Sequence, residues 1–435
     1  MKKSLIILWI IIIVGAGFLF LNKFQTTIDP KLNPPQDIEE EETPNKSFSE
    51  YLAAGDKYFA EANYKLAARN YRLATQVSAT SSKAFLKLGQ AYQKNHQPSE
   101  ALSALTQAST LNPNSLTIKL ALVQSNLDLN KIAEAKELVW QLDRANFHVK
   151  YYTGLILVLY KEFDQAKEFF TDIVATDSTA SEEIKKNSEQ ILNRYETFGY
   201  YSEAEKIFLQ TMLAKTLTEI DQHYLAIPLL FDVISQKNNY RDAWIVLGYA
   251  YLNTNQLPEA IDALSQAEAL DAEKPETLFF LGLAYQKSAK PDKAIYYIEK
   301  AADAGFEPVD EINLRRCELY TDQKDYEKAA QKFEQIISSN PDNLDAFVSL
   351  VSLYLDNLNQ PEKALTAANK AIQYHNKDAI SYNLKAWALT ALGRADEAKK
   401  HLEKATSLGG SDLNSAMIRA KITQLNLQIT NPPIK

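Results

Sequence analysis

The stretch from Arg241 to Lys274 begins with a regular spacing of apolar side chains. Trp244, Leu247 and Tyr251 are separated by three and four residues, so an α-helix would place all three along one side. This spacing predicts a short helix with one side directed at a neighbour.

A turn and a second helix are predicted in the same stretch. The segment 253–257 is rich in residues that favour turns, and Pro258 fits the first turn of a helix, where its missing N–H costs nothing. Ala260, Leu264 and Ala267 then recur at helical spacing. Two such short helices cannot bury their apolar sides alone, so neighbours of the same kind are expected.

Small residues stand where the two helices should meet. Gly248 on the first helix and Ala260 on the second predict a close approach of the two backbones. Tyr249 follows Gly248 directly, and a helix turns it about 100° away from that contact. We therefore expect Gly248 to be a packing residue and Tyr249 to face another surface.

The same frame recurs along the chain. Units that begin at Ser82 and at Pro275 repeat the glycine, the tyrosine and the two alanines, as Gly89, Tyr92, Ala101 and Ala108 and as Gly282, Tyr285, Ala294 and Ala301. A period of 34 residues with W-x2-L-G-x2-Y, then A-x3-F, A and P, resembles the tetratricopeptide repeat family. The resemblance covers nearly all of the chain after residue 47. It implies an all-α fold, an α-solenoid in which antiparallel helix pairs form a right-handed superhelix without strands.

The repeats divide into two runs around an irregular segment. Repeats 1–4 are expected at 48–178 and repeats 5–10 at 207–412, with an extra helix or decayed repeat at 179–206. The unit 344–378 has one extra residue, which we place in its turn. Pro228 lies inside a predicted second helix, where it predicts a kink or a late helix start. Residues 413–435 are expected to form a polar capping helix and a tail.

The N-terminus has a different character. Lys2 and Lys3 precede an uncharged apolar run from Leu5 to Leu21, which as a helix would span roughly 25 Å. We interpret residues 1–22 as an uncleaved transmembrane signal anchor. It would be N-in, with the repeats outside the cytoplasmic membrane. The alternative is a signal peptide cleaved at Val14-Gly15-Ala16, which would release the protein.

An acidic, proline-rich linker is predicted between the anchor and the repeats. Residues 23–47 contain four prolines and the acidic run Glu39–Glu42, which disfavour a packed structure. Metal or partner binding by the acidic run is the less favoured interpretation.

Composition and motifs argue against several functions. The 55 acidic residues outnumber the 47 basic residues and give a net charge of −8, which does not suit a nucleic-acid partner. The five histidines are scattered, Cys317 is the only cysteine, and no phosphate-binding, nucleophile-elbow or zinc motif occurs. We therefore expect no catalysis, no cofactor, no metal and no small-molecule substrate.

A partner-binding groove is implied by the resemblance. In the family, the second, fifth, ninth and twelfth positions of each first helix point into the concave groove. Transferred to this sequence, they give Tyr151, Leu155, Ile245, Tyr249, Leu252, Phe279, Leu283, Gln286, Asn383 and Trp387. The clamp that the family uses for chaperone tails is not reproduced. The groove is apolar and aromatic, which suits a helix or an extended segment of a protein partner.

Two functions are consistent with these features. The first is a membrane-anchored scaffold that mediates protein–protein interactions. The alternative is an accessory or regulatory subunit of an envelope enzyme or of a secretion or assembly complex, with catalysis on another chain. The two differ in whether an enzymatic activity co-purifies with the protein.

Overall fold

The structure, a computed structural model, describes residues 45–175, 181–197 and 203–409. These residues form 21 α-helices and one π-helical segment, and they contain no strand. The predicted anchor, the linker up to residue 44 and the predicted capping helix lie outside the described residues. Within them, no helix is both long enough and apolar enough to cross a membrane.

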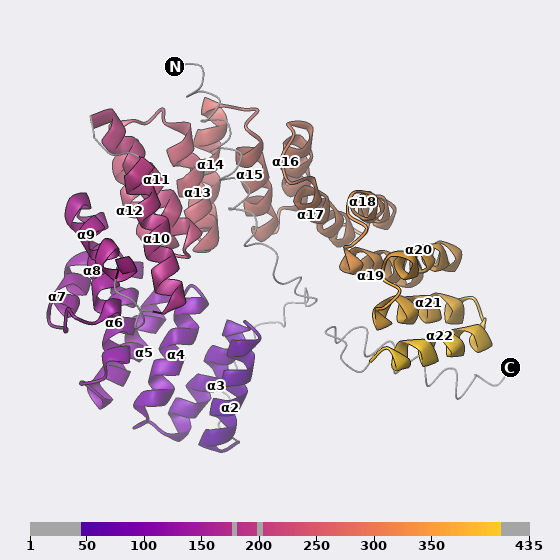
Figure 1. Ribbon diagram of the computed structural model, residues 1–435, viewed down its shortest axis with the longest axis horizontal. Helices are drawn as coiled ribbons and strands as arrows, with labels where there is room; N and C mark the ends of the chain where they lie inside the picture. The colour runs from indigo at the N-terminus through magenta and orange to yellow at the C-terminus, as the bar shows by residue number, and fades with distance from the viewer. Residues whose placement is uncertain (1–44, 176–180, 198–202, 410–435) are drawn as a thin grey trace. The chain divides into compact units, whose positions relative to one another are not determined.

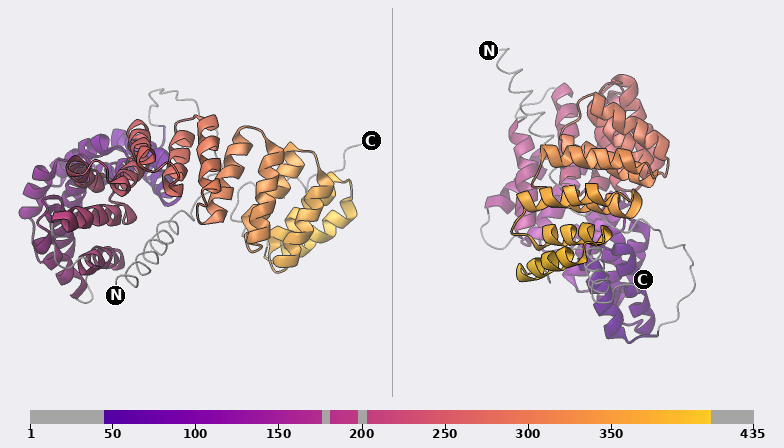
Figure 2. Two further views of the ribbon diagram at one scale, coloured as in Figure 1. Left: turned by 90° about the horizontal axis from the view of Figure 1, so that it is seen from above. Right: turned by 90° about the vertical axis from the view of Figure 1, so that its right-hand side faces the viewer.

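Apart from α10, the helices follow one another as antiparallel pairs, and the described residues form two compact units that divide between Asp271 and Ala272 (Figures 1 and 2). The first unit contains α2 Phe48–Ala60, α3 Tyr64–Val77, α4 Ser82–Lys94, α5 Pro98–Leu111, α6 Leu116–Asp128, α7 Ile132–Trp140, α8 Phe147–Leu159, α9 Phe163–Ala175, α10 Glu182–Thr197, α11 Glu203–Glu219, α12 His223–Gln236, α13 Arg241–Asn253 and α14 Leu257–Leu270. The second contains α15 Pro275–Lys287, α16 Pro291–Asp303, α17 Val309–Asp322, α18 Tyr326–Ser339, α19 Leu344–Ser352, η1 Leu353–Asn357, α20 Pro361–Tyr374, α21 Ala379–Ala391 and α22 Ala395–Ser407.

Glycine allows close packing within several pairs. A Cβ atom on Gly248 would lie 2.4 Å from Leu264 Cγ and 3.3 Å from the backbone oxygen of Ala260. The predicted close approach at Ala260 is thus present, and Leu264 is the side chain that fills the space over the glycine. Gly55, Gly89, Gly154 and Gly282 meet a side chain of their own second helix in the same way. Any larger residue at these positions would push the two helices apart.

The turns within the pairs share one geometry. Each turn contains a single residue with positive φ. The N–H of the residue that follows it donates to a carbonyl group near the end of the first helix, for example Gln256 N to Tyr251 O at 2.9 Å. Glycine occupies the positive-φ position only at Gly393. The other turns use Ala62, His96, Asn130, Lys161, Asp221, Asn255, Ala289, Lys324 and Asn359.

The sequence predicts that the extra residue of the unit 344–378 lies in its turn. The structure shows that this prediction is wrong. The turn of this unit has the usual length, with Asn359 at positive φ, but Gln360 N donates to Tyr354 O, one residue further back than in the other turns. The first helix therefore ends in the π-helical segment η1, whose wider turn absorbs the added residue.

The irregular region of the first unit contains one unpaired helix and one helix with an internal proline. α10 packs against α9 and α11, between the fourth and fifth pairs. α12 begins at His223 and continues as an α-helix through Pro228, so the predicted late start does not occur. The proline is the sixth residue of the helix, beyond the first turn, so the helix lacks one backbone hydrogen bond at this point.

The start of α12 also contacts helices that lie far away in the sequence. α12 packs against α6 and α8. Gln124 Nε2 on α6 donates to Gln222 Oε1 at 3.0 Å, and the Tyr224 hydroxyl donates to His96 O at 3.4 Å. Lys161 forms an ion pair with Asp232 at 2.7 Å. The first unit is thus held together by contacts across the array as well as along it.

Candidate protein-binding site

The predicted groove residues of the first unit lie mostly in the interior. Tyr151 and Leu155 on α8, and Ile245, Tyr249 and Leu252 on α13, are all buried. Tyr249 packs edge-on against His223 with 5.9 Å between ring centroids, and burial raises the pKa of its hydroxyl. These side chains therefore help to hold neighbouring helices together.

The predicted groove residues of the second unit are divided between interior and surface. Phe279 and Leu283 on α15 and Asn383 on α21 are buried, and Phe279 stacks on Phe306 at 4.1 Å. Gln286 and Trp387 are half-buried, and both remain reachable by a partner. Of the ten predicted residues, eight are buried and two, Gln286 and Trp387, are half-buried.

A pocket of about 660 Å³ lies at a different place, between the second helices α12 and α14, with α13 as its floor. Its lining combines aromatic, aliphatic, amide and acidic side chains: Phe231, Asn238, Asn239, Trp244, Leu247, Tyr251, Glu259, Asp262, Ala263, Gln266 and Leu270. Sequence reasoning missed this site because it transferred only the groove positions of the first helices. The available signal was an apolar residue, Phe231, at an exposed position of a second helix.

The apolar part of this pocket is fixed by contacts around α13. Phe231 lies edge-on to Tyr251 with 6.4 Å between centroids, and the Trp244 indole Nε1 donates to Asn238 O at 2.8 Å. Phe231 and Leu270 keep 49% and 43% of their surface exposed, and here the two lie at the edge of the same pocket. The pocket thus has a positioned aromatic floor and an apolar rim.

The polar part of the pocket is acidic. Glu259 and Asp262 on α14 are exposed and form no ion pair within the described residues. Burial raises the pKa of Tyr251, and the charge of Glu259 raises it further. No lysine or arginine lines the pocket. Its electrostatic character therefore suits a cationic group.

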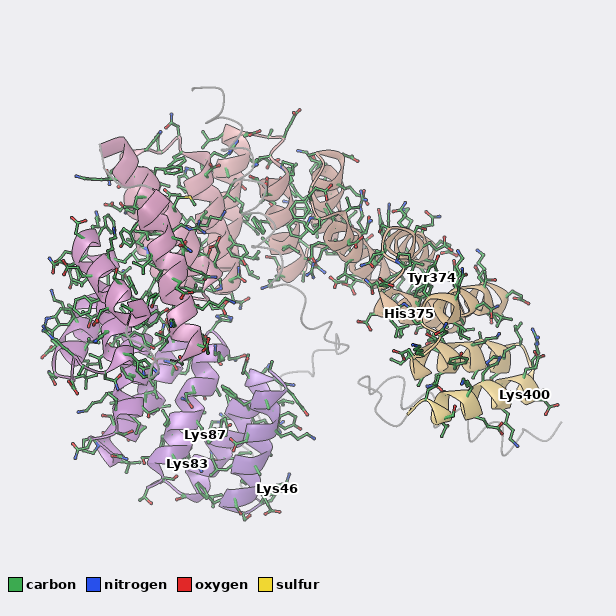
Figure 3. The ribbon with its side chains drawn as sticks, viewed as in Figure 1. Lys46, Lys83, Lys87, Tyr374, His375 and Lys400 are labelled. Carbon is green, nitrogen blue, oxygen red and sulfur yellow. The ribbon has the colours of Figure 1, made fainter. Side chains whose placement is uncertain are left out.

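Other candidate chemistry is satisfied within the fold. Lys83 and Lys87 lie next to each other on α4 (Figure 3). Lys87 pairs with Asp56 at 2.7 Å, and Asp56 also accepts from the Tyr71 hydroxyl at 2.6 Å. The Cys317 thiol is buried, and burial raises its pKa, so it is not a reactive thiolate. Among the described residues, no three His, Cys, Asp or Glu side chains are grouped so as to hold a metal ion.

The array of short antiparallel helix pairs defines the protein as a helical repeat protein, and family comparisons identify the repeat. Models described as "Tetratricopeptide repeat" match residues 86–139, 279–344, 320–388 and 379–408, and one described as "TPR repeat" matches 248–288. The chain is therefore a tetratricopeptide-repeat protein. Proteins of this kind are scaffolds for protein–protein interactions without catalysis of their own.

Individual relatives are distant. A DnaJ homolog subfamily C member 7 homolog of Schizosaccharomyces pombe is 22% identical over 59% of this chain, which spans only 56% of that relative. The yeast Tom70 structure is 14% identical, with 88% of this chain and 96% of that chain covered and a TM-score of 0.34. YrrB, described as a TPR protein with an unusual peptide-binding site, is 16% identical, with 56% and 96% covered and a TM-score of 0.24.

Proposed function

We propose that this chain is a membrane-tethered scaffold whose repeats bind segments of partner proteins outside the cytoplasmic membrane. The pocket between α12, α13 and α14 carries the binding part of this proposal. It joins exposed apolar side chains to carboxylates that have no partner within the described chain. Such a surface is stabilised when a partner covers its apolar part and neutralises its charge.

The tether rests on the sequence. The apolar run from Leu5 to Leu21 is long enough to enter a bilayer, and Lys2 and Lys3 favour retention of the N-terminus inside. Mass spectrometry of the purified N-terminus and protease shaving of spheroplasts test this part. An intact N-terminus with accessible repeats is the expected result. A chain that begins after Ala16, or repeats that stay protected, would contradict the tether or its orientation.

Binding is tested by site-specific photo-crosslinking in cells. A photoreactive amino acid replaces Gln266 at the pocket, or Gln286 or Trp387 at the two predicted groove positions that remain half-exposed. Ser99 on the exposed side of α5 is the control position. We expect discrete protein adducts from Gln266 and none from Ser99. Failure of all three positions to capture a protein would overturn the scaffold function. Capture of an enzyme whose activity depends on this chain would favour the accessory-subunit alternative.

A further inference from the structure

Tyrosines at one position of the first helices have a recurrent environment in the second unit. A lysine of the same helix pair covers the ring in three successive pairs. Lys293 Nζ lies 5.1 Å from the ring centroid of Tyr285, Lys328 Nζ 5.2 Å from that of Tyr320, and Lys363 Nζ 5.6 Å from that of Tyr354. Cation–π attraction of this kind stabilises the ring face that the lysine covers. In these pairs the array supplies its own cation.

The preceding second helix completes the environment in two of these pairs. The Tyr320 hydroxyl donates to Glu299 at 2.8 Å, and the Tyr354 hydroxyl donates to Glu334 at 2.7 Å. Each tyrosine therefore has a cation on its ring and a carboxylate at its hydroxyl. The ring and the hydroxyl of these two tyrosines therefore already have partners within the array.

The second pair of the first unit solves the same problem differently. Glu100 stands at the lysine position of this pair. The positive charge of Arg72, on the preceding second helix, lowers the pKa of Tyr92 against the rise that burial causes. A positive charge of the array therefore again acts on the tyrosine.

At Tyr251 both sources of positive charge are missing. Glu259 occupies the lysine position of α14, and Phe231 occupies the position on α12 that corresponds to Arg72. Within the described residues no cation lies over the Tyr251 ring, and its hydroxyl makes no hydrogen bond. The pocket is found at this pair, where a cation of the array is replaced by an aromatic wall and an acidic rim.

We propose that this pocket binds a segment of a partner protein that carries a lysine or arginine next to an apolar residue. The partner's cation takes the place that Lys293, Lys328 and Lys363 occupy elsewhere, over Tyr251 and beside Glu259 and Asp262. Its apolar neighbour covers Phe231 and Leu270. This inference rests on the proposed binding function and names the chemistry of the partner and a site outside the predicted groove.

The test measures binding of labelled peptides to the full-length chain by fluorescence anisotropy. The probe alternates leucine and arginine. One control peptide has citrulline, a neutral isostere, in place of arginine, and another has serine in place of leucine. We expect the first peptide to bind at least about tenfold more tightly than either control, since both the charge and the apolar contact are required.

Two matched variants locate the site. Glu259→Lys installs the lysine of the other pairs, and we expect it to weaken binding about tenfold while the thermal melting point stays unchanged. Glu100→Lys makes the same charge change at the equivalent place on α5 and should leave binding unchanged. Equal loss in both variants would show general attraction to an acidic protein, and full binding by Glu259→Lys would remove the pocket as the site. If the peptide does not bind while photo-crosslinking still captures partners, this inference fails and the scaffold function stands.

Discussion

The two units differ in how far their contacts reach along the chain. In the second unit, extensive contacts join successive helices or helices one step further apart, such as α19 and α21. In the first unit, α12 also packs against α6 and α8, and Tyr224 reaches the turn at His96. A repeat array with nearest-neighbour contacts transmits damage only locally, whereas cross-contacts couple distant repeats. The same repeat architecture therefore supports two degrees of cooperativity.

The largest expected effect comes from overpacking one helix pair in each unit, and the damage should spread further in the first unit than in the second. Gly89→Leu and Gly282→Leu each force a side chain into a space where even a Cβ would lie within 2.7 Å of the facing residue, and each should cost about 1–3 kcal/mol. Hydrogen-exchange mass spectrometry should show that Gly282→Leu loosens α15 to α17 only. Gly89→Leu should also loosen the start of α12, because that segment contacts the α4–α5 turn. Ser99→Leu, at an exposed position of α5, is the control. Protection of α12 that is unchanged in Gly89→Leu would contradict the coupling.

The stability of the first unit, in which α12 contacts α6, should depend on pH. Burial raises the pKa of Asp128 from 3.8 to about 7, although a hydrogen bond from Gln124, which also binds Gln222, opposes the shift. Because the folded pKa lies above the unfolded one, ionisation disfavours folding. Stability should fall as pH rises from about 4 to 7 and level off above that range.

Asp128→Asn removes this titration. We expect a gain on the order of 1 kcal/mol at pH 8 and none at pH 4. Thermal melts across this range provide the measurement. A gain that is the same at both pH values would mean that the ionised carboxylate is not the cause.

A smaller effect distinguishes the two tyrosine environments. Tyr320→Phe removes a hydroxyl that donates to Glu299 and should cost about 1 kcal/mol. Tyr251→Phe removes a hydroxyl without a hydrogen bond within the described residues and should change the free energy of unfolding much less. Urea unfolding of both variants gives the comparison. Equal costs would show that Tyr251 has a bonded partner after all.

The smallest effect concerns the turns. Lys324→Gly should stabilise the second unit by about 0.5 kcal/mol, because glycine adopts positive φ without strain. His96→Gly relieves the same strain but removes a ring that lies 6.5 Å from Tyr224, so no net gain is expected. Thermal melts of both variants provide the measurement. A clear gain in His96→Gly would argue that the His96 ring adds nothing to the contact with Tyr224.

The sequence was most informative where a residue has only one possible reason to be small. Gly248 predicted the approach of two backbones because a glycine inside a helix lowers stability unless a neighbour packs closely against it, and the structure confirms the approach. It was least informative for Tyr249 and Phe279, since an aromatic residue can equally face a groove or fill a core. Periodicity gives the side of a helix but not what covers it. The pocket depended on the combination of Phe231, Tyr251 and Glu259 from three helices, which no single repeat contains.

The π-helical segment η1 has a consequence for how such a chain can change over time. An extra residue kept in an α-helix would rotate everything after it by about 100° and turn the buried sides of later helices outward. The wide turn at Leu353–Asn357 confines the added length to one helix end, and Asn359 and Gln360 restore the ordinary geometry immediately afterwards. An insertion at this point is therefore hidden from the following repeats, so this repeat can vary in length without requiring compensating changes in its neighbours.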